Sequence, residues 1–253
     1  MKNKNFVFTS VLSAVILLTI SACAPKPSSD PLSTTDAAAP ENTQVLEAAN
    51  IGDCFNPYYP VTSGKVWNYI TKTEANEDPF SIHYEDVTSS SYTQVIQTGD
   101  SLVKIAWTCS PDGLLSNQFS SLGISGVEGV EFQTVDVTGL ALPSEPNWQV
   151  GFSWDTGYKL KLIITADENT LESEGEAVMT NTIAAIESVT VPAGTYPNAY
   201  RVDVTSTMNI LLFGTQSEIP LNYSNWFVKD IGMVKSSFGD SPIPVEVELI
   251  SIE

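Results

Sequence analysis

Few residues of this sequence could perform acid–base or nucleophilic chemistry, and none of them completes a known catalytic pattern. His83 is the only histidine, and it lies between Ile82 and Tyr84 in a stretch that predicts a strand. The stretch Gly123-Ile124-Ser125-Gly126 comes near the Gly-x-Ser-x-Gly turn of the α/β-hydrolases without completing it, so we expect a loop there. Phosphate-binding and dinucleotide-binding glycine patterns do not occur. We therefore expect no catalytic residues and no cofactor.

Carboxylates are numerous, with 30 Asp and Glu residues, so suggestive pairs arise by chance. Glu172, Glu174 and Glu176 share one face of a predicted strand and are most simply a solvated face that discourages edge pairing. The turn Asp167-Glu168-Asn169 offers oxygen ligands of the kind that calcium prefers, but EF-hand spacing is missing. We expect no metal site, and a glycan hydrolase, which needs two converging acids, is kept only as an alternative.

The aromatic residues are the stronger indication of a binding site. Gly64-Lys65-Val66-Trp67-Asn68 and Gly151-Phe152-Ser153-Trp154-Asp155 share a Gly-x-x-Trp pattern followed by Asn or Asp. Either an internal duplication or a common way to start a strand accounts for the likeness. Strand alternation places Tyr69 on the face of Trp67, and Tyr158 on the face of Trp154. These four side chains either fill a core or line a concave site for a ligand. We expect the filled core and keep all four as candidate ligand contacts.

A different chemistry is indicated at the N-terminus. Lys2 and Lys4 precede an apolar run from Phe6 to Ile20 that is short for a membrane span and has the length of a signal-peptide core. The junction Ile20-Ser21-Ala22-Cys23 resembles the lipobox of bacterial lipoproteins. This resemblance implies that residues 1–22 are a signal peptide, and that the thiol of Cys23 receives a diacylglycerol that anchors the mature chain to a membrane. Two or three acyl chains suffice for stable anchoring.

The remaining cysteines form an even pair. If Cys23 is lipidated, Cys54 and Cys109 are the two free thiols, and they lie outside the cytoplasm. Paired cysteines in an oxidising compartment predict a disulfide, although two separate buried thiols are the alternative. Neither cysteine has a neighbour at metal-ligand spacing.

Charge limits the partners that this protein can have. The chain has 11 basic and 30 acidic residues and a formal net charge of −19, and cleavage before Cys23 would remove two of the lysines. Such a surface repels nucleic acid and anionic lipid headgroups. We therefore expect no nucleic-acid partner and no membrane contact besides the anchor.

The chain divides into three parts by composition. Residues 1–22 form the signal peptide. Residues 23–50 are rich in Pro, Ser, Thr and Ala and lack aromatic residues, which predicts a flexible tether. Residues 51–253 form a single β domain, of a size that can bury a full core.

The domain shows strand periodicity and no sustained helical period. We predict an all-β fold, an antiparallel meander of about eleven strands curled into a barrel or half-barrel. Turn signals such as Ser110-Pro111-Asp112-Gly113 separate the strands. The predicted strands cover 66–70, 81–87, 92–98, 102–109, 114–119, 130–137, 154–165, 177–191, 199–213, 220–228, 233–238 and 245–252.

Three motifs carry a family resemblance. They are Tyr59-Pro60-x-x-x-Gly64-x-x-Trp67-x-Tyr69, the run Val189 to Val202 with Pro192-Ala193-Gly194 and Tyr200-Arg201, and Trp226-Phe227-x4-Ile231-Gly232-x-Val234-Lys235. Together they resemble the TapB-like group of uncharacterised bacterial lipoproteins, a domain of unknown function. That group is similar in shape to the curved sheets of LolA and LolB, which hold lipid in a hydrophobic groove. The resemblance implies structural roles for these motifs and carries over no catalytic position.

The sequence thus predicts a lipid-anchored extracytoplasmic lipoprotein of the bacterial cell envelope that binds without catalysis. Its partner would be an apolar ligand in the curved sheet or an envelope protein. The alternatives are a structural or assembly component of the envelope and a glycan-acting hydrolase.

Lipidation can be checked directly. Radiolabelled palmitate should enter the wild-type protein and should not enter the Cys23→Ser variant, because only the thiol of Cys23 follows the junction. Equal labelling of the two proteins would contradict the anchor.

Overall fold

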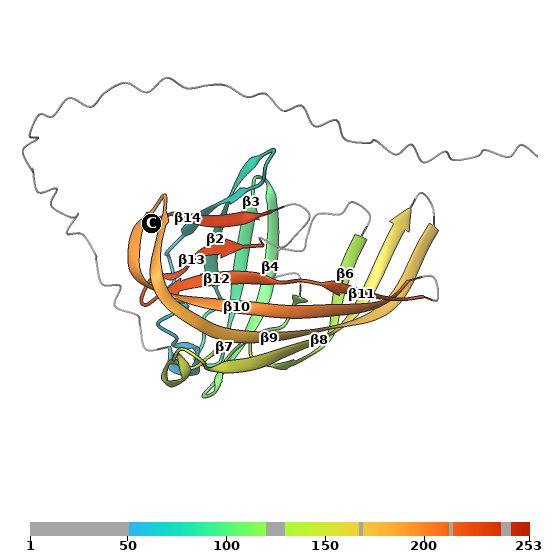
Figure 1. The fold of residues 1–253 in the computed structure, drawn as a ribbon, viewed down its shortest axis with the longest axis horizontal. Helices are drawn as coiled ribbons and strands as arrows, with labels where there is room; N and C mark the ends of the chain where they lie inside the picture. Colours follow the sequence, from blue (N-terminus) through green and yellow to red (C-terminus); the bar gives the residue numbers. More distant parts are fainter. Residues whose placement is uncertain (1–50, 120–129, 167–168, 213–214, 239–243) are drawn as a thin grey trace, which may run out of the picture. The chain divides into compact units, whose positions relative to one another are not determined.

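A computed structural model describes residues 51–119, 130–166, 169–212, 215–238 and 244–253. These residues form an antiparallel sheet of 14 strands (Figure 1), together with the short 3-10 helices η1 (Gly52–Cys54) and η3 (Glu145–Asn147). The strands are β1 (Trp67–Lys72), β2 (Glu77–Glu85), β3 (Ser91–Thr98), β4 (Ser101–Ser110), β5 (Gly113–Ser116), β6 (Val130–Gly139), β7 (Leu142–Pro143), β8 (Ser153–Ala166), β9 (Asn169–Val191), β10 (Gly194–Leu212), β11 (Thr215–Pro220), β12 (Tyr223–Val228), β13 (Gly232–Ser237) and β14 (Glu246–Ile252). The predicted all-β antiparallel fold is confirmed.

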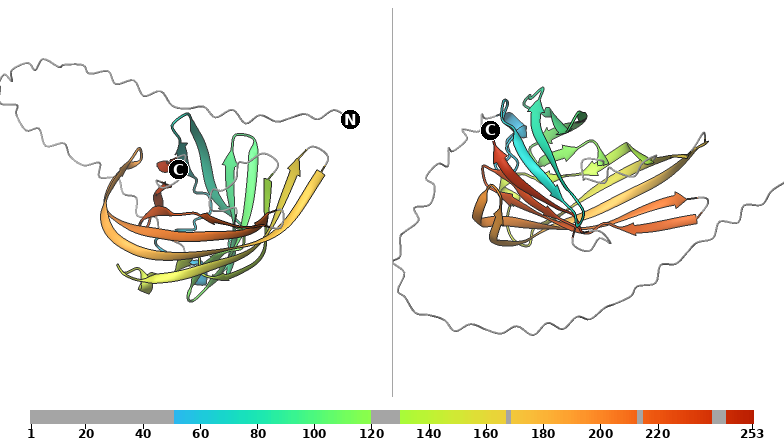
Figure 2. Two further views of the ribbon diagram at one scale, coloured as in Figure 1. Left: turned by 45° about the vertical axis from the view of Figure 1, so that its right-hand side comes forward. Right: turned by 90° about the horizontal axis from the view of Figure 1, so that it is seen from above.

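The strand order explains how the sheet curls. It runs β6-β8-β9-β10-β12-β13-β14-β1-β2-β3-β4-β5-β7, and β11 also pairs with β10. The longest strands, β9 and β10, have 23 and 19 residues. Both bend strongly along their length (Figure 2). The sheet therefore curls into an open half-barrel.

The two ends of this order are joined by one short segment. β6 and β7 are consecutive along the chain, and Leu140 and Ala141 lie between them. The Leu140 N–H donates to the Asp155 carbonyl on the β8 side (3.2 Å), and the Ala141 N–H donates to the Leu114 carbonyl of β5 (2.8 Å). One edge of the sheet is thereby tied to the other over this segment.

Alternation in β8 shows how the sequence sets the two faces of the sheet. The outward residues include Lys159 and Lys161, which form ion pairs on the outer surface. The inward residues before Ile164 are buried and are Trp154, Thr156, Tyr158, Leu160 and Leu162, and Ile164 itself is half-buried. Tyr158 thus shares the face of Trp154, as strand alternation predicts.

The Gly-x-x-Trp blocks start strands in the same way. Gly64 and Gly151 adopt positive φ angles of 78° and 91°. Each is the third residue of a turn closed by an N–H···O bond, Lys65 to Thr62 in the first (3.4 Å) and Phe152 to Gln149 in the second (3.0 Å). Glycine suits this turn because it carries no Cβ. The shared pattern is therefore a shared strand start.

The predicted number of strands, about eleven, is lower than the number found. β7 has two residues and is too short for a periodic pattern. β11 is polar, which gave no hydrophobic signal. β7 forms by pairing with the four-residue β5, and β11 forms by pairing with the long β10.

Several predictions lie outside the described residues. They are the signal peptide, Cys23, the tether, the Gly123–Gly126 loop, and Asp167 with Glu168. The chain separates into two units, Met1–Thr43 and Gln44–Glu253, and the described residues all belong to the second. Among them, no helix has the length and apolar character needed to cross a membrane.

The joining segment can be tested at Gly139. This residue has φ +79°, and a Cβ there would lie 2.1 Å from the Asp155 carbonyl oxygen. Gly139→Ala should lower the free energy of unfolding by at least about 3 kcal/mol, measured by urea denaturation. Gly99 is the matched control, because it also has positive φ (+56°) but open space around it. Gly99→Ala should cost only about 1 kcal/mol, and equal costs would show that the close approach does not matter.

Candidate functional site

A disulfide joins Cys54 of η1 to Cys109 of β4, with an S–S distance of 1.98 Å and a sequence separation of 55. Both cysteines are buried. The Asp53 N–H also donates to the Ser89 carbonyl (2.9 Å). The predicted pairing is confirmed, and it fastens the start of the domain to the sheet.

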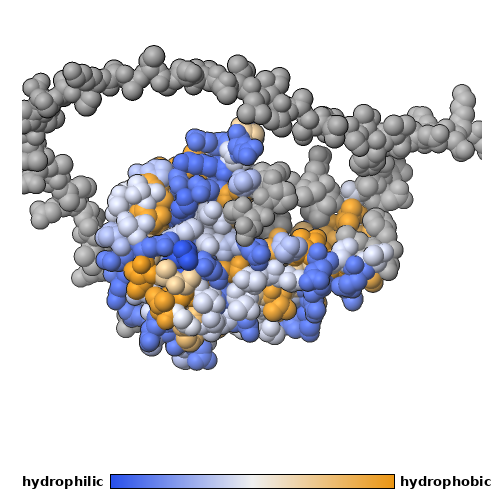
Figure 3. All heavy atoms as spheres, in the orientation of Figure 1, coloured by the Kyte–Doolittle hydropathy of each residue, from blue (hydrophilic) through white to orange (hydrophobic). Residues whose placement is uncertain are grey.

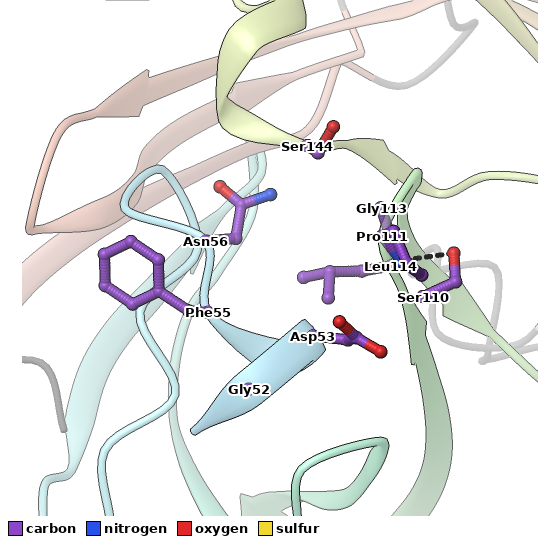
Figure 4. A pocket seen from close by; sticks show the side chains of 9 residues that line it. All are labelled: Gly52, Asp53, Phe55, Asn56, Ser110, Pro111, Gly113, Leu114 and Ser144. Carbon is purple, nitrogen blue, oxygen red and sulfur yellow. Dashed lines mark hydrogen bonds between the residues drawn. The ribbon is translucent and has the colours of Figure 1, made fainter. Parts of the chain in front are cut away.

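A small crevice lies beside this disulfide (Figure 4). Its volume is about 190 Å³, below the usual range for ligand pockets. The buried Asn56 amide donates to the Pro143 carbonyl (2.9 Å), and its oxygen accepts from the Tyr58 N–H (3.0 Å). The polar side chains here hold loops together. The lining residues are Gly52, Asp53, Phe55, Asn56, Ser110, Pro111, Gly113, Leu114 and Ser144.

Trp67 and Tyr69, two of the candidate ligand contacts, are buried, with exposures of 3% and 4%. The Trp67 indole N–H donates to the Ile231 carbonyl (2.9 Å), and the Tyr69 hydroxyl donates to the Met233 carbonyl (2.8 Å). The polar atoms of both side chains therefore fasten β1 to the chain around the start of β13.

Trp154 and Tyr158 are also buried, at 8% and 2% exposed. The Tyr158 hydroxyl donates to the Ser116 carbonyl at 3.5 Å, and its ring packs edge-on against Phe119. The Trp154 ring stacks on Phe152, and among the described residues its Nε1 has no hydrogen-bond partner. Each Gly-x-x-Trp block brings its own Trp and Tyr to one face. In the described part of the chain, no ring contact joins the first block to the second.

Aromatic residues that the sequence did not single out complete the interior. Tyr92 stacks on Trp107 and meets Tyr84 edge-on. The Gln94 amide donates to the Tyr59 hydroxyl (2.8 Å) and accepts from the Trp107 indole N–H (3.0 Å). Only three-dimensional pairing brings these groups together, so no sequence pattern signals them. The concave face is filled by the protein's own side chains, and a ligand-contact role for the four predicted aromatics stays a prediction.

Burial also changes the acidity of these tyrosines. Removal from water disfavours the phenolate, which raises the pKa of Tyr158 to about 12 against the opposing effect of its hydrogen bond to Ser116. Burial likewise raises the pKa of Tyr69, Tyr84 and Tyr92. The interior therefore holds neutral phenols at physiological pH.

Residues of the second and third family motifs meet on the outer face of the sheet. Arg201, the sole arginine, binds Glu187 (3.1 Å) and Asp203 (3.0 Å). The Trp226 indole N–H donates to Glu187 (2.7 Å), and the Lys235 ammonium lies 6.0 Å from the centre of the Trp226 ring. These contacts cross β9, β10, β12 and β13, which gives the motifs the structural role that the resemblance implied.

A larger groove lies where two hairpins diverge. β9 and β10 pair as far as Gly175 and Ile210, and the Ser173 hydroxyl then donates to the Leu211 carbonyl; beyond these contacts the β8–β9 and β10–β11 hairpins separate (Figures 1 and 2). The groove has a volume of about 930 Å³. This end of the sheet shows hydrophobic and strongly hydrophilic atoms side by side (Figure 3). The lining residues are Val135, Lys159, Leu160, Lys161, Leu171, Glu172, Ser173, Glu174, Gly175, Glu176, Asn209, Leu211 and Gln216. The sequence analysis identified only the three glutamates.

Catalytic groups are not assembled in the described residues. His83 Nε2 lies 3.4 Å from Glu85, whose other oxygen binds Lys104 (2.6 Å). This is a surface ion-pair arrangement. Within the described ranges, no group of three His, Cys, Asp or Glu side chains is placed to hold a metal ion.

The sequence matches the DUF3108-like family model over residues 63–239. The match covers more than half of the chain, so the protein belongs to the DUF3108-like family. No curated protein matches the sequence. The predicted likeness to the TapB-like group and to LolA and LolB is not confirmed by these comparisons.

Solved structures share the fold. A protein from Parabacteroides distasonis, described as a "putative lipoprotein", superposes with a TM-score of 0.53 at 15% identity, covering 78% of this chain and 99% of its own. A protein from Bacteroides fragilis, described as a "putative exported protein" with a YmcC-like fold, gives 0.50 at 14% identity, covering 79% and 100%. At these identities the likeness extends to the fold alone.

The raised phenol pKa predicts alkaline destabilisation. An unfolded tyrosine titrates near pH 10, so the native state holds more protons than the unfolded state between about pH 10 and 12. Tyr158 makes its full contribution to the free energy of unfolding below about pH 10. Above that pH the contribution should fall by about 1.4 kcal/mol per pH unit. Urea denaturation at pH 9 to 11 should show a steeper decline for the wild type than for Tyr158→Phe. Identical pH dependence in the two proteins would contradict the assignment.

The filled interior predicts the behaviour of Trp154 variants. Trp154→Ala should lower the free energy of unfolding by about 3–5 kcal/mol, because it leaves a cavity. Trp154→Phe should cost less, since the Nε1 that it removes has no partner. Neither the wild type nor Trp154→Phe should bind a fluorescent fatty-acid probe saturably. A saturable probe signal that depends on Trp154 would instead show an open apolar groove.

Proposed function

We propose that this protein is a lipid-anchored extracytoplasmic lipoprotein that binds another protein of the bacterial cell envelope and performs no catalysis. The binding surface is the outer face of the sheet and its hairpins. An apolar ligand inside the curl is the less favoured alternative.

The lipid anchor is supported by the leader and by the fold. Lys2 and Lys4, the apolar run and Cys23 have the order of a lipoprotein signal. The two neighbours of similar fold are described as a lipoprotein and as an exported protein. These agree with export and anchoring through Cys23.

The packing of the concave face favours a protein partner over an apolar ligand. Trp67, Tyr69, Trp154 and Tyr158 are each at most 8% exposed. Three of their four polar atoms bond to carbonyl oxygens of other segments. An apolar ligand would have to displace these contacts, whereas the outer surface offers exposed apolar side chains without rearrangement.

Exposed apolar residues support a protein partner. Leu102, Val150, Val178 and Ile186 are 59%, 55%, 51% and 47% exposed. Covering any of these side chains with a partner would remove apolar surface from water. A hydrolase is less favoured, because Glu172, Glu174 and Glu176 are all exposed on one strand and none has the dry surroundings of a general acid.

Cross-linking in cells tests the proposal. A photo-activated amino acid placed singly at Leu102, Val150, Val178 or Ile186 should give a discrete protein adduct from at least one position. The same substitution in a Cys23→Ser background should lose the adduct, because the protein is no longer held at the membrane. No adduct from any position, together with a lipid that co-purifies with the wild type, would favour the apolar-ligand alternative.

A further inference from the structure

We infer that residues 51–61 form a strap over an aromatic binding site, and that reduction of the Cys54–Cys109 disulfide opens this site to an aromatic, proline-containing segment of another protein. The site is closed while the disulfide is intact. It goes beyond the proposed function and is independent of the outer surface.

The strap lies between two separate parts of the curled sheet. Its Asp53 N–H donates to the Ser89 carbonyl in the β2–β3 turn (2.9 Å). Its Pro57 carbonyl accepts from the Asp230 N–H in the β12–β13 turn (2.6 Å). β14 and β1 lie between these turns in the strand order. Residues 51–61 are all described and contain η1 but no strand, so the strap connects parts of the sheet without joining its ladder.

The first strap tyrosine occupies a space between rings of other segments. Tyr58 is 6% exposed, and Pro57 beside it is also buried. The Tyr58 ring stacks on Trp148, with 4.1 Å between ring centres, and meets Tyr200 of β10 edge-on at 5.0 Å. Withdrawal of the strap would leave Trp148 and Tyr200 facing a space that fits an aromatic ring with a proline next to it.

The second strap tyrosine adds a polar contact. Tyr59 stacks on Trp107, with 5.3 Å between ring centres, and its hydroxyl accepts from the Gln94 amide (2.8 Å). Tyr92 stacks on the same Trp107, and among the described residues its buried hydroxyl has no hydrogen-bond partner. This cluster therefore carries one more polar group than the strap satisfies. A ligand with a hydroxyl or carbonyl beside its aromatic ring can replace the Tyr59 hydroxyl at Gln94.

The disulfide decides whether the strap stays in place. Pro57 and Pro60 have no N–H to donate, and the strap lies outside the strand ladder. The conformational entropy lost in ordering such a segment is of the same order as the gain from burying its side chains. The bond from Cys54 to Cys109 offsets part of this entropy, because it keeps the strap beside β4. Its loss should shift the balance toward release.

The crevice beside the disulfide gives a reductant its approach. Both cysteines are buried, but their sequence neighbours Asp53, Phe55 and Ser110 line the crevice (Figure 4). A thiolate of a dithiol reductant attacks one sulfur, and the second thiol of the reductant resolves the mixed disulfide. Cys54 and Cys109 become thiols with the two protons of the dithiol, which leaves as a disulfide.

The test is a titration of the full-length protein in detergent with a labelled peptide of residues 51–61 that carries Cys54→Ser. Fluorescence anisotropy should show saturable binding in dithiothreitol, and binding about tenfold or more weaker without it. Cys54→Ser/Cys109→Ser protein should bind with or without reductant. Tyr58→Ala/Tyr59→Ala in the peptide should weaken binding about tenfold or more. The same pair in the reduced protein should strengthen it, because the competing strap is weakened.

Two further measurements complete the test. A peptide that keeps only Pro-Tyr-Tyr-Pro between Gly and Ser residues should also bind the reduced protein, and its failure would overturn the ligand class. On reduction, hydrogen exchange should accelerate at residues 51–61 and stay slow in β9 and β10. Faster exchange throughout the sheet would overturn the inference, because the disulfide would then hold the whole fold. Equal peptide binding with and without reductant, or no saturable binding, would overturn it as well.

Discussion

The structure depends on the need of one curled sheet to fill its own concave face. The described part of the chain is mostly strand, with short 3-10 helices such as η1 and η3, so large side chains from the strands must meet across the curl. Tyr and Trp suit this task, since each supplies a wide apolar surface and a polar atom that can reach a distant carbonyl. Trp67 bonds to Ile231 and Tyr69 to Met233, each across 164 positions of sequence. The same residues that bury apolar surface thus also fix which strands lie near each other.

The curl is held at its margins by one disulfide and by one hydrogen-bonded segment. The disulfide between Cys54 and Cys109 fastens the entry of the chain to β4, which removes freedom from a long loop of the unfolded chain. The segment from Gly139 to Pro143 passes from β8 to β5 and bonds to both. Away from these margins the pairing of β9 with β10 ends at Gly175 and Ile210, and the Ser173 hydroxyl bonds to the Leu211 carbonyl before the β8–β9 and β10–β11 hairpins diverge. The molecule therefore combines a packed part with an end where two hairpins separate.

The sequence predicted the parts of this architecture that depend on local pattern. Alternation in β8 placed Tyr158 on the face of Trp154, and the Gly-x-x-Trp blocks indicated two strand starts. The pairing of Cys54 with Cys109 followed from the number of cysteines and the expected compartment. The sequence could not predict β7, because two residues have no period, or β11, because its polar residues give no hydrophobic signal. The contact of Gln94 with Tyr59 and Trp107, and the groove, were also beyond it. The Gln94 contact and the groove both depend on how the strands pair in three dimensions, which a sequence pattern does not encode.

The interior is filled by the protein's own side chains, so we propose that binding takes place on the outer surface. The residues of the sequence motifs that the structure brings together on the outer face, Arg201 and Trp226, meet at Glu187, and the Gly-x-x-Trp blocks start strands. Native mass spectrometry of the protein, released from the membrane in mild detergent, tests the claim most directly. The account predicts the mass of the lipidated chain alone, with no apolar molecule retained after the detergent is stripped. A second lipid retained in stoichiometric amount, and lost in Trp154→Ala, would contradict it.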